Sequence, residues 1–109
     1  MLQAYGYVRK HFLMNDVEVT AAEGTLAKIA AQRGVKLVDV LVEDLANSPA
    51  AFETVLSLAL QSRDRILIVP SEFHLDANGE SKDVRKRLEV NGITVISGDE
   101  LAEPARDDR

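Results

Sequence analysis

The stretch RILIVP, residues 65–70, is a continuous run of apolar residues that begins at an arginine and ends at a proline. Such a run is typical of a central strand in a parallel sheet, because helices cover both of its faces. Further runs rich in small and β-favouring residues occupy 3–9, 35–43 and 93–97, so we predict four strands. Gly6, in the first of them, predicts that a helix or another stretch of backbone packs closely there.

Segments with a helical spacing of apolar residues separate the four strands. The stretch TAAE, residues 20–23, has the form of a capping box, and Gly34 is placed to end the helix that follows. The apolar periodicity of this helix also allows an earlier start. Ser48, followed by a proline, predicts the N-cap and first turn of a second helix. A third helix is predicted to begin at Ser81 or Asp83.

The order of these elements is β-α-β-α-β-α-β, which predicts an α/β fold. Strands that alternate with helices form a mainly parallel, doubly wound sheet with helices on both faces, and therefore three layers. The 109 residues fit one domain, which we assign to residues 1–98. Residues 71–79 are predicted to be polar and irregular. Residues 99–109 form a polar, acidic C-terminal tail whose end we expect to be disordered.

Composition narrows the classes of function. The chain has no cysteine, so it offers no disulfide, no thiolate metal site and no cysteine nucleophile. No stretch approaches the ~20 apolar residues of a membrane span, and the N-terminus lacks an apolar signal core. We therefore expect a cytoplasmic protein without membrane contact, and no cofactor. The net charge of −5 argues against non-specific nucleic-acid binding by the domain as a whole.

Binding sites in a doubly wound sheet form beyond the C-terminal ends of the strands. The first strand ends in the basic cluster Arg9, Lys10 and His11, and the second ends in two acidic residues at 43–44. The third strand runs into the polar segment 71–78. Any surface chemistry is expected among these residues.

Four stretches resemble one known family in their order and spacing: AYGYVR (4–9), VKLVDVLVED (35–44), SPAAFETVLSLAL (48–60) and ILIVPSEFHL (66–75). They are similar to the N-terminal catalytic domain of the serine recombinases, the resolvase and invertase family. The resemblance implies a resolvase-like sheet with the strand order 2-1-3-4. It also implies phosphoryl transfer by a serine just after the first strand, with arginines that neutralise the scissile phosphate.

The resemblance also assigns the reactive positions, and most of them hold a different residue here. Arg9 matches the arginine of the family's first strand, whereas His11 stands in place of the serine nucleophile. Ser48, His74 and Ala77 stand where the family has arginines. Without those positive charges, a phosphodiester loses its transition-state stabilisation. The resemblance therefore implies a catalytically inactive domain that acts as a regulatory or protein-interaction module, with a protein partner or a homo-oligomer as its contact.

The two histidines allow a different interpretation. His11 and His74 follow neighbouring strands in the implied order, so they are candidates for a metal pair, with Asp16, Asp44 or Asp76 as further ligands. His11 is also a candidate nucleophile of a repurposed phosphate-ester site. Two histidines without a fixed ligand spacing are weak evidence for a metal. We therefore favour two unrelated loop histidines and predict no metal.

Arg9 likewise has two interpretations. As the one retained residue of the reactive type, it is a candidate ligand for a phosphate or sulfate group. Acidic side chains are abundant at the end of the neighbouring strand, however. We therefore favour a structural ion pair of Arg9 with Glu43 or Asp44.

A basic cluster on the third predicted helix is a candidate nucleic-acid patch. Its four cations are Lys82, Arg85, Lys86 and Arg87. Four cations on a short segment can contact phosphates, which would make the chain a DNA-associated accessory to recombination. The acidic net charge favours the other interpretation, a solvated helix face paired with neighbouring carboxylates.

Overall fold

The structure of the chain is a computed structural model, which describes residues 1–10, 14–44, 50–78 and 80–99, with the backbone alone at 76–78 and 81. Strands and helices alternate along it, as predicted. In chain order the elements are β1 (Leu2–Lys10), α1 (Asp16–Arg33), β2 (Val35–Asp44), α2 (Ala50–Gln61), β3 (Ile66–Val69), η2 (Glu72–Asn78), α3 (Ser81–Val90) and β4 (Thr94–Ser97).

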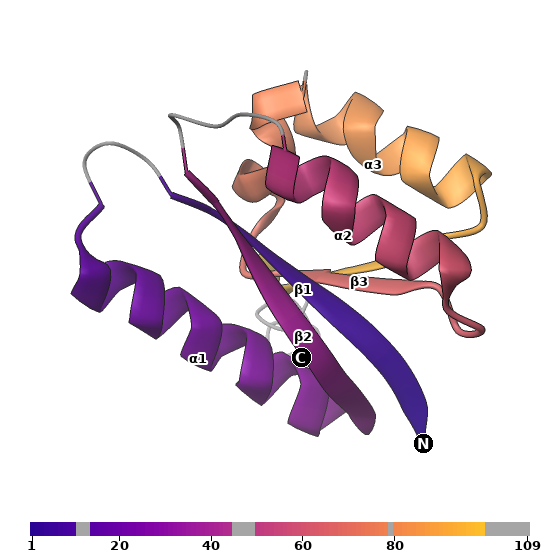
Figure 1. Ribbon diagram of the computed structural model, residues 1–109, viewed down its shortest axis with the longest axis horizontal. Coiled ribbons are helices and arrows are strands. Elements are labelled where there is room, and N and C mark those ends of the chain that lie inside the picture. Colours follow the sequence, from indigo (N-terminus) through magenta and orange to yellow (C-terminus); the bar gives the residue numbers. More distant parts are fainter. Residues whose placement is uncertain (11–13, 45–49, 79, 100–109) are drawn as a thin grey trace, which may run out of the picture.

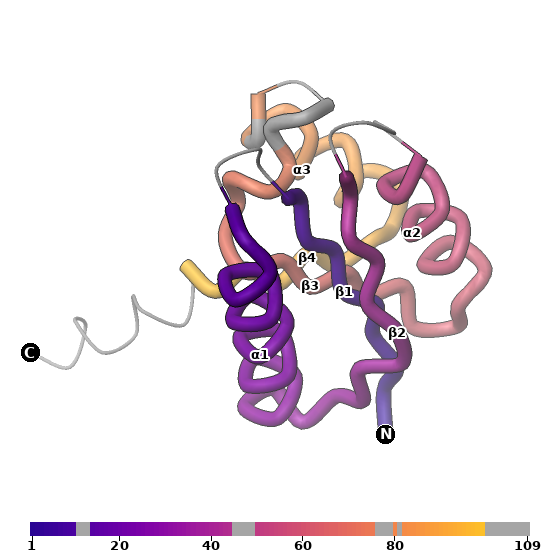
Figure 2. The backbone as a smooth tube through the Cα atoms, turned by 60° about the vertical axis from the view of Figure 1, so that its left-hand side comes forward, coloured from indigo at the N-terminus to yellow at the C-terminus, as the bar shows by residue number. Residues whose placement is uncertain are grey.

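The four strands form one parallel sheet in the order β2-β1-β3-β4. Helix α1 covers one face of the sheet, and α2 and α3 cover the other, which gives three layers (Figure 1 and Figure 2). The predicted α/β class and the strand order 2-1-3-4 are confirmed. All four residues of β3 are buried, because this strand is central and is covered on both faces.

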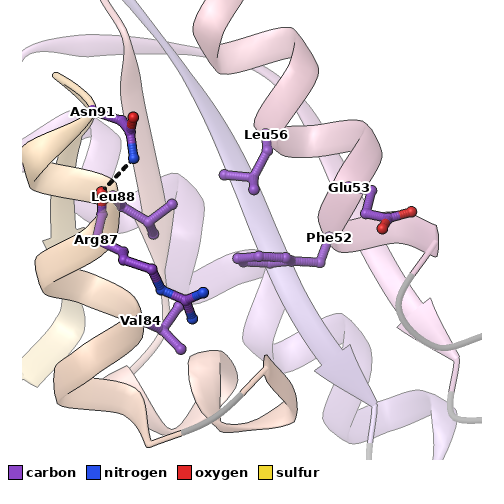
Figure 3. Close-up of a pocket in the computed structure, with 7 residues that line it drawn as sticks. All are labelled: Phe52, Glu53, Leu56, Val84, Arg87, Leu88 and Asn91. Atoms are coloured by element: carbon purple, nitrogen blue, oxygen red, sulfur yellow. Dashed lines mark hydrogen bonds between the residues drawn. The ribbon is translucent and has the colours of Figure 1, made fainter.

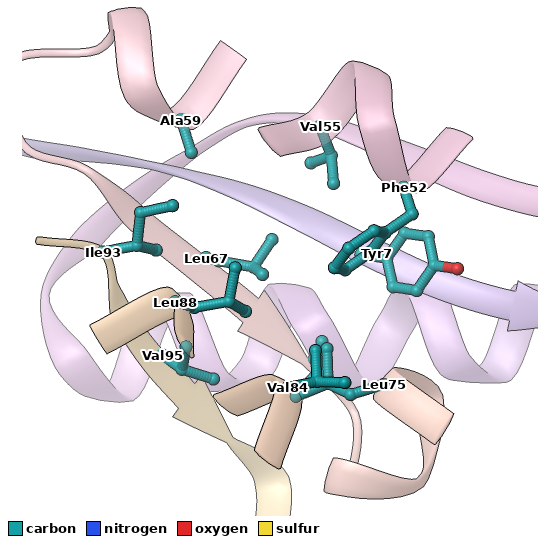
Figure 4. Close-up of a cluster of buried hydrophobic side chains, with 11 residues drawn as sticks. Tyr7, Phe52, Val55, Ala59, Leu67, Leu75, Val84, Leu88, Ile93 and Val95 are labelled. Atoms are coloured by element: carbon teal, nitrogen blue, oxygen red, sulfur yellow. The ribbon is translucent and has the colours of Figure 1, made fainter. Parts of the chain in front are cut away.

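Each face of the sheet buries its own hydrophobic cluster. One cluster lies beneath α2 and α3, where Tyr7 and Leu67 of the sheet meet Phe52 and Val84 of the helices (Figure 4). The rings of Tyr7 and Phe52 pack edge to face, with their centroids 5.3 Å apart. The other cluster lies beneath α1, around Leu26. The first cluster brings the end of β1 and the start of α2 together, which positions the candidate site.

Gly6 lies where β1 passes beneath α1. A Cβ atom at this position would lie 2.7 Å from Cδ1 of Leu26 and 3.2 Å from Cγ2 of Val40. Because Leu26 is fully buried, its side chain has little space into which to move. The close helix packing that this glycine predicts is confirmed.

Helix α1 begins earlier than the pattern at 20–23 predicts. Its N-cap is Asn15, whose side chain accepts a hydrogen bond from the amide of Glu18 at 2.9 Å. The Glu18 carboxylate accepts from the Asn15 amide in return, at 3.1 Å, so these two residues form the capping box. The helix start at 20–23 is therefore wrong, because those residues lie within α1. Gly34 ends the helix with φ = 68°, as predicted.

The segment after β3 is more regular than predicted. Residues 72–78 form the 3₁₀ helix η2, although their polar composition indicates an irregular loop. The reason is Leu75, which is fully buried in the cluster beneath α3 and holds the segment against the sheet. Helix α3 begins at Ser81, one of the two predicted starts, and buries Val84 and Leu88.

Two predictions about the fold concern residues outside the described ranges. These are the N-cap at Ser48 and the disorder at the end of the acidic tail, and both stay predictions. Among the residues that the structure describes, no helix has the length and apolar character needed to cross a membrane.

Candidate functional site

The candidate site lies where the C-terminal ends of β1 and β2 meet the segment that follows β3. In the register of the sheet, Arg9 pairs with Glu43 and Lys10 pairs with Asp44. Strand β3 pairs with β1 on the side away from β2. Helix η2 follows β3 in the chain and contacts β1. We call this region, formed by the ends of β1 and β2 and by η2, the sheet edge. It brings together residues from three separate segments of the chain.

His74 binds the backbone of β1. Its Nδ1 atom accepts a hydrogen bond from the Arg9 amide at 2.9 Å. This bond requires an unprotonated Nδ1, so a neutral His74 carries its proton on Nε2. An arginine, which has only donors, cannot make the same contact. His74 is therefore a structural link between η2 and the end of β1.

Glu43 is a buried carboxylate, only 1% exposed, at the end of β2. One of its oxygens accepts hydrogen bonds from the Phe52 amide at 3.0 Å and from the Tyr7 hydroxyl at 3.3 Å. The other accepts from the Ala51 amide at 3.3 Å. Glu43 thus provides a negatively charged acceptor for two amides at the start of α2 that have no partner within the helix. Its charge also interacts favourably with the positive end of the helix dipole.

The environment of Tyr7 keeps its phenol neutral. Burial is the main cause that raises the pKa of Tyr7 above its usual value, and the charge of Glu43 and the hydrogen bond to it add to this effect. The positive charge of Arg9 acts in the opposite direction. Because the proton stays on Tyr7, its hydroxyl remains the donor to the buried carboxylate.

The predicted ion pair of Arg9 with Glu43 or Asp44 is not formed, and the Glu43 oxygens bind Tyr7 and α2 instead. Within the described parts of the chain, no side-chain ion pair includes Arg9. Its Nε atom is buried and lacks a hydrogen-bond partner there. Lys10, by contrast, lies 3.6 Å from Asp16 at the start of α1.

The remaining candidate residues are only partly described. His11 and Ser48 lie outside the described residues, and at Ala77 the backbone lies in η2. The proximity of His11 to His74 therefore stays a prediction. In the described ranges, no three histidine or carboxylate side chains lie together as a metal site would require.

The basic cluster of α3 divides into two parts. Arg85 points inward: it donates to Glu72 at 2.9 Å, to Glu89 at 3.2 Å and to the carbonyl oxygen of Val95 at 3.1 Å. It thereby joins η2, α3 and β4. The other three cations of the cluster, Lys82, Lys86 and Arg87, are exposed.

Sequence reasoning missed the role of Tyr7 and Glu43. The sequence predicts a strand that includes Tyr7, and it suggests Glu43 only as a partner for Arg9. Glu43 lies within β2 and binds amides eight and nine positions further along the chain, so it occupies no capping position that a local pattern could reveal. Its hydrogen bond with Tyr7 forms only if the two side chains lie on the same face of the sheet, and the register of β1 and β2 determines this.

Comparison with solved structures relates this arrangement to known proteins. The chain is similar to the C-terminal catalytic domain of ISC1926 TnpA, an IS607-like serine recombinase, with a TM-score of 0.70. The chain has a resolvase-like fold. The match covers 88% of this chain and 67% of that one at 14% sequence identity, so it concerns the fold alone. No protein-family model and no curated protein matches the sequence.

Proposed function

We propose that this chain is a catalytically inactive, serine-recombinase-like domain that works by contact with other proteins, as a regulator or accessory of recombination. The observation that carries the proposal is the hydrogen bond from the Arg9 amide to Nδ1 of His74. The resemblance gives the family an arginine at position 74 that would neutralise a phosphate. Here the side chain accepts a bond from the backbone instead, a role that a guanidinium cannot take.

The charge of the sheet edge supports the same conclusion. Its described cations are Arg9 and Lys10, and Lys10 is paired with Asp16. Glu43 and Asp44 lie on the adjoining strand, in register with the two cations. The charges of the two carboxylates offset those of the two cations, so the field at this edge offers little of the positive charge that phosphoryl transfer needs.

The intact core supports a role that depends on the fold rather than on the reactive groups. The four-stranded sheet has a hydrophobic cluster on each of its two faces. A stable domain with an idle edge still presents its helical surfaces to partners. We therefore assign the function to those surfaces.

A second candidate function is DNA contact through α3. Lys82 and Lys86 are exposed one turn apart on this helix, and Arg87 lies beside Lys86. Such contacts are electrostatic and would be strongest at low salt. A gel shift at low salt tests this candidate: binding that is lost in Lys82→Glu/Lys86→Glu supports it, and no retardation removes DNA as a direct partner.

The test of the main proposal is incubation with supercoiled DNA and with simple phosphodiesters, with and without divalent metals. We expect no nicking and no hydrolysis above the buffer control. Turnover that disappears in His11→Ala would contradict the proposal and support a repurposed phosphate-ester site. His74→Ala serves as a companion variant, since a loss of turnover there too would place the reaction at the sheet edge.

A further inference from the structure

Two hollows of the surface have apolar linings, and they differ in how much of that lining is exposed. The hollow of about 350 Å³ between α2 and α3 is floored by Phe52, Val84 and Leu88 (Figure 3). These three side chains are buried in the core, so they offer little surface to a partner. The other hollow, of about 120 Å³, lies beside η2. Four residues line it: Met14, Ser71, Phe73 and His74.

Phe73 is the exposed wall of the hollow beside η2. It is 70% exposed, whereas the other aromatic residues that the structure describes are buried or half-buried. An aromatic side chain in water forgoes the free energy that its burial would provide. The hollow has about four times the ~30 Å³ that one water takes in the liquid, so it suits one more aliphatic side chain.

The chain returns to this hollow after β4. Gly98 passes directly against Pro70, whose carbonyl oxygen a Cβ atom at position 98 would overlap. The carboxylate of the next residue, Asp99, accepts a hydrogen bond from the Glu72 amide at 3.1 Å. Glu72 is the first residue of η2 and precedes Phe73. The start of the C-terminal tail is therefore fixed beside the exposed aromatic ring.

We infer that residues 100–103 of the tail turn onto η2 and that Leu101 seats in the hollow against Phe73. Leu101 is the one large apolar residue in the stretch ELAEPARDDR, residues 100–109. It lies two residues beyond Asp99, a span of at most about 7 Å in extended chain. Phe73 lies one residue beyond the amide that Asp99 binds, so the leucine side chain reaches the hollow.

A seated tail closes the η2 side of the sheet edge. His74 lines the hollow and also accepts the hydrogen bond from the Arg9 amide. A leucine side chain over the hollow excludes water from this ring, and a hydrogen bond is stronger where the local dielectric is low. The tail thus acts as a latch that protects the link between η2 and the end of β1.

The tail has an advantage over other occupants of the hollow. Because it is tethered at Asp99, its effective concentration at the hollow is in the millimolar range, which a separate partner protein must exceed. Phe12 and Leu13 are the other apolar side chains close to the hollow in sequence, since they precede Met14. Their connection is fixed at both ends, by Lys10 and Met14, whereas the tail is fixed at one.

Disulfide trapping tests the inference, because the chain has no cysteine of its own. Ser71→Cys/Ala102→Cys places one thiol in the lining of the hollow and the other next to Leu101. The rate of disulfide formation in a glutathione buffer is followed by mass spectrometry. Adding Leu101→Ser should slow it about tenfold, the factor that corresponds to the burial of one leucine side chain. Asp108→Ser, a polar change further along the tail, is the matched control and should leave the rate unchanged.

A second variant makes the test specific for the hollow. Phe73→Ser removes the other half of the contact and should slow trapping by a similar factor. Together with Leu101→Ser it should slow trapping no further, because both changes remove one shared contact. Thermal melts confirm that each variant is folded before rates are compared.

The outcomes separate the occupants. Trapping that ignores Leu101→Ser, or losses from the two changes that multiply, would overturn the inference. Trapping that Leu13→Ser accelerates, and that Leu101→Ser leaves unchanged, assigns the hollow to the connection before α1 and overturns it as well. Trapping measures the position of the tail and nicking measures turnover, so this inference and the proposed function fail independently.

Discussion

Glu43 gives the most quantitative prediction about the sheet edge. In Glu43→Gln, the amide oxygen can replace the carboxylate oxygen that serves Phe52 and Tyr7. The amide nitrogen then faces the Ala51 amide, so one hydrogen bond becomes an apposition of two donors. The two bonds that remain lose the strength that an ionised acceptor gives them.

The expected loss follows from these contacts. One lost bond to a charged group is worth about 1.5–3 kcal/mol, and the lost charge at the start of α2 adds about 0.3–1 kcal/mol. Relief from burying a charge offsets part of this sum. We therefore expect the free energy of unfolding to fall by about 2 kcal/mol, which lowers Tm by about 8 °C in a domain of this size.

The assay is urea and thermal denaturation followed by circular dichroism. The matched control is Glu53→Gln, which removes an exposed carboxylate from the first turn of the same helix. We expect it to cost about 0.5 kcal/mol, the value of a surface interaction with the helix dipole. If the two variants lose the same stability, the buried carboxylate is not held as described, and the reasoning is refuted.

Three further predictions concern β1 and α3. Gly6→Ala should lower the free energy of unfolding by about 1–3 kcal/mol, because its Cβ would meet Leu26 at 2.7 Å; adding Leu26→Val should recover part of the loss in urea denaturation, and no recovery would contradict this cause. Since burial raises the pKa of Tyr7, folding favours the neutral phenol, so stability is complete below the ordinary tyrosine pKa of about 10 and declines above it. Tyr7→Phe should flatten that decline between pH 9 and 12, and parallel curves would speak against it. Arg85→Ala should cost about 1–3 kcal/mol in thermal melts, because a carboxylate and a strand carbonyl lose their donor, whereas Lys86→Ala should change stability by less than about 0.5 kcal/mol.

The sheet could be predicted because its information is local. The run at 65–70 is apolar throughout, and a strand covered on both faces requires that composition. The start of α1 was misplaced for a local reason as well. Asn15 and Glu18 have the same spacing as Thr20 and Glu23, so two capping boxes compete. The earlier one is formed: Asn15 has the extended backbone of an N-cap, and position 20 lies within α1.

The candidate site could be predicted only as a region. The topology that the sequence predicts places Arg9 and the segment after β3 at the same end of the sheet. The contacts themselves depend on register and on side-chain direction. The Arg9 amide reaches His74 across 65 positions, and Tyr7 reaches Glu43 across 36. No local pattern encodes such contacts.

The central claim is that the sheet edge no longer takes a phosphodiester, and an NMR titration tests it most directly. The backbone amide of Arg9 and the ring of His74 form one hydrogen bond, so both resonances report on any group that enters the edge. The titrant is a short DNA duplex at low salt, where electrostatic binding is strongest. The account predicts that both signals stay unchanged, whatever happens along α3. A saturable shift of both signals that disappears at high salt would contradict it.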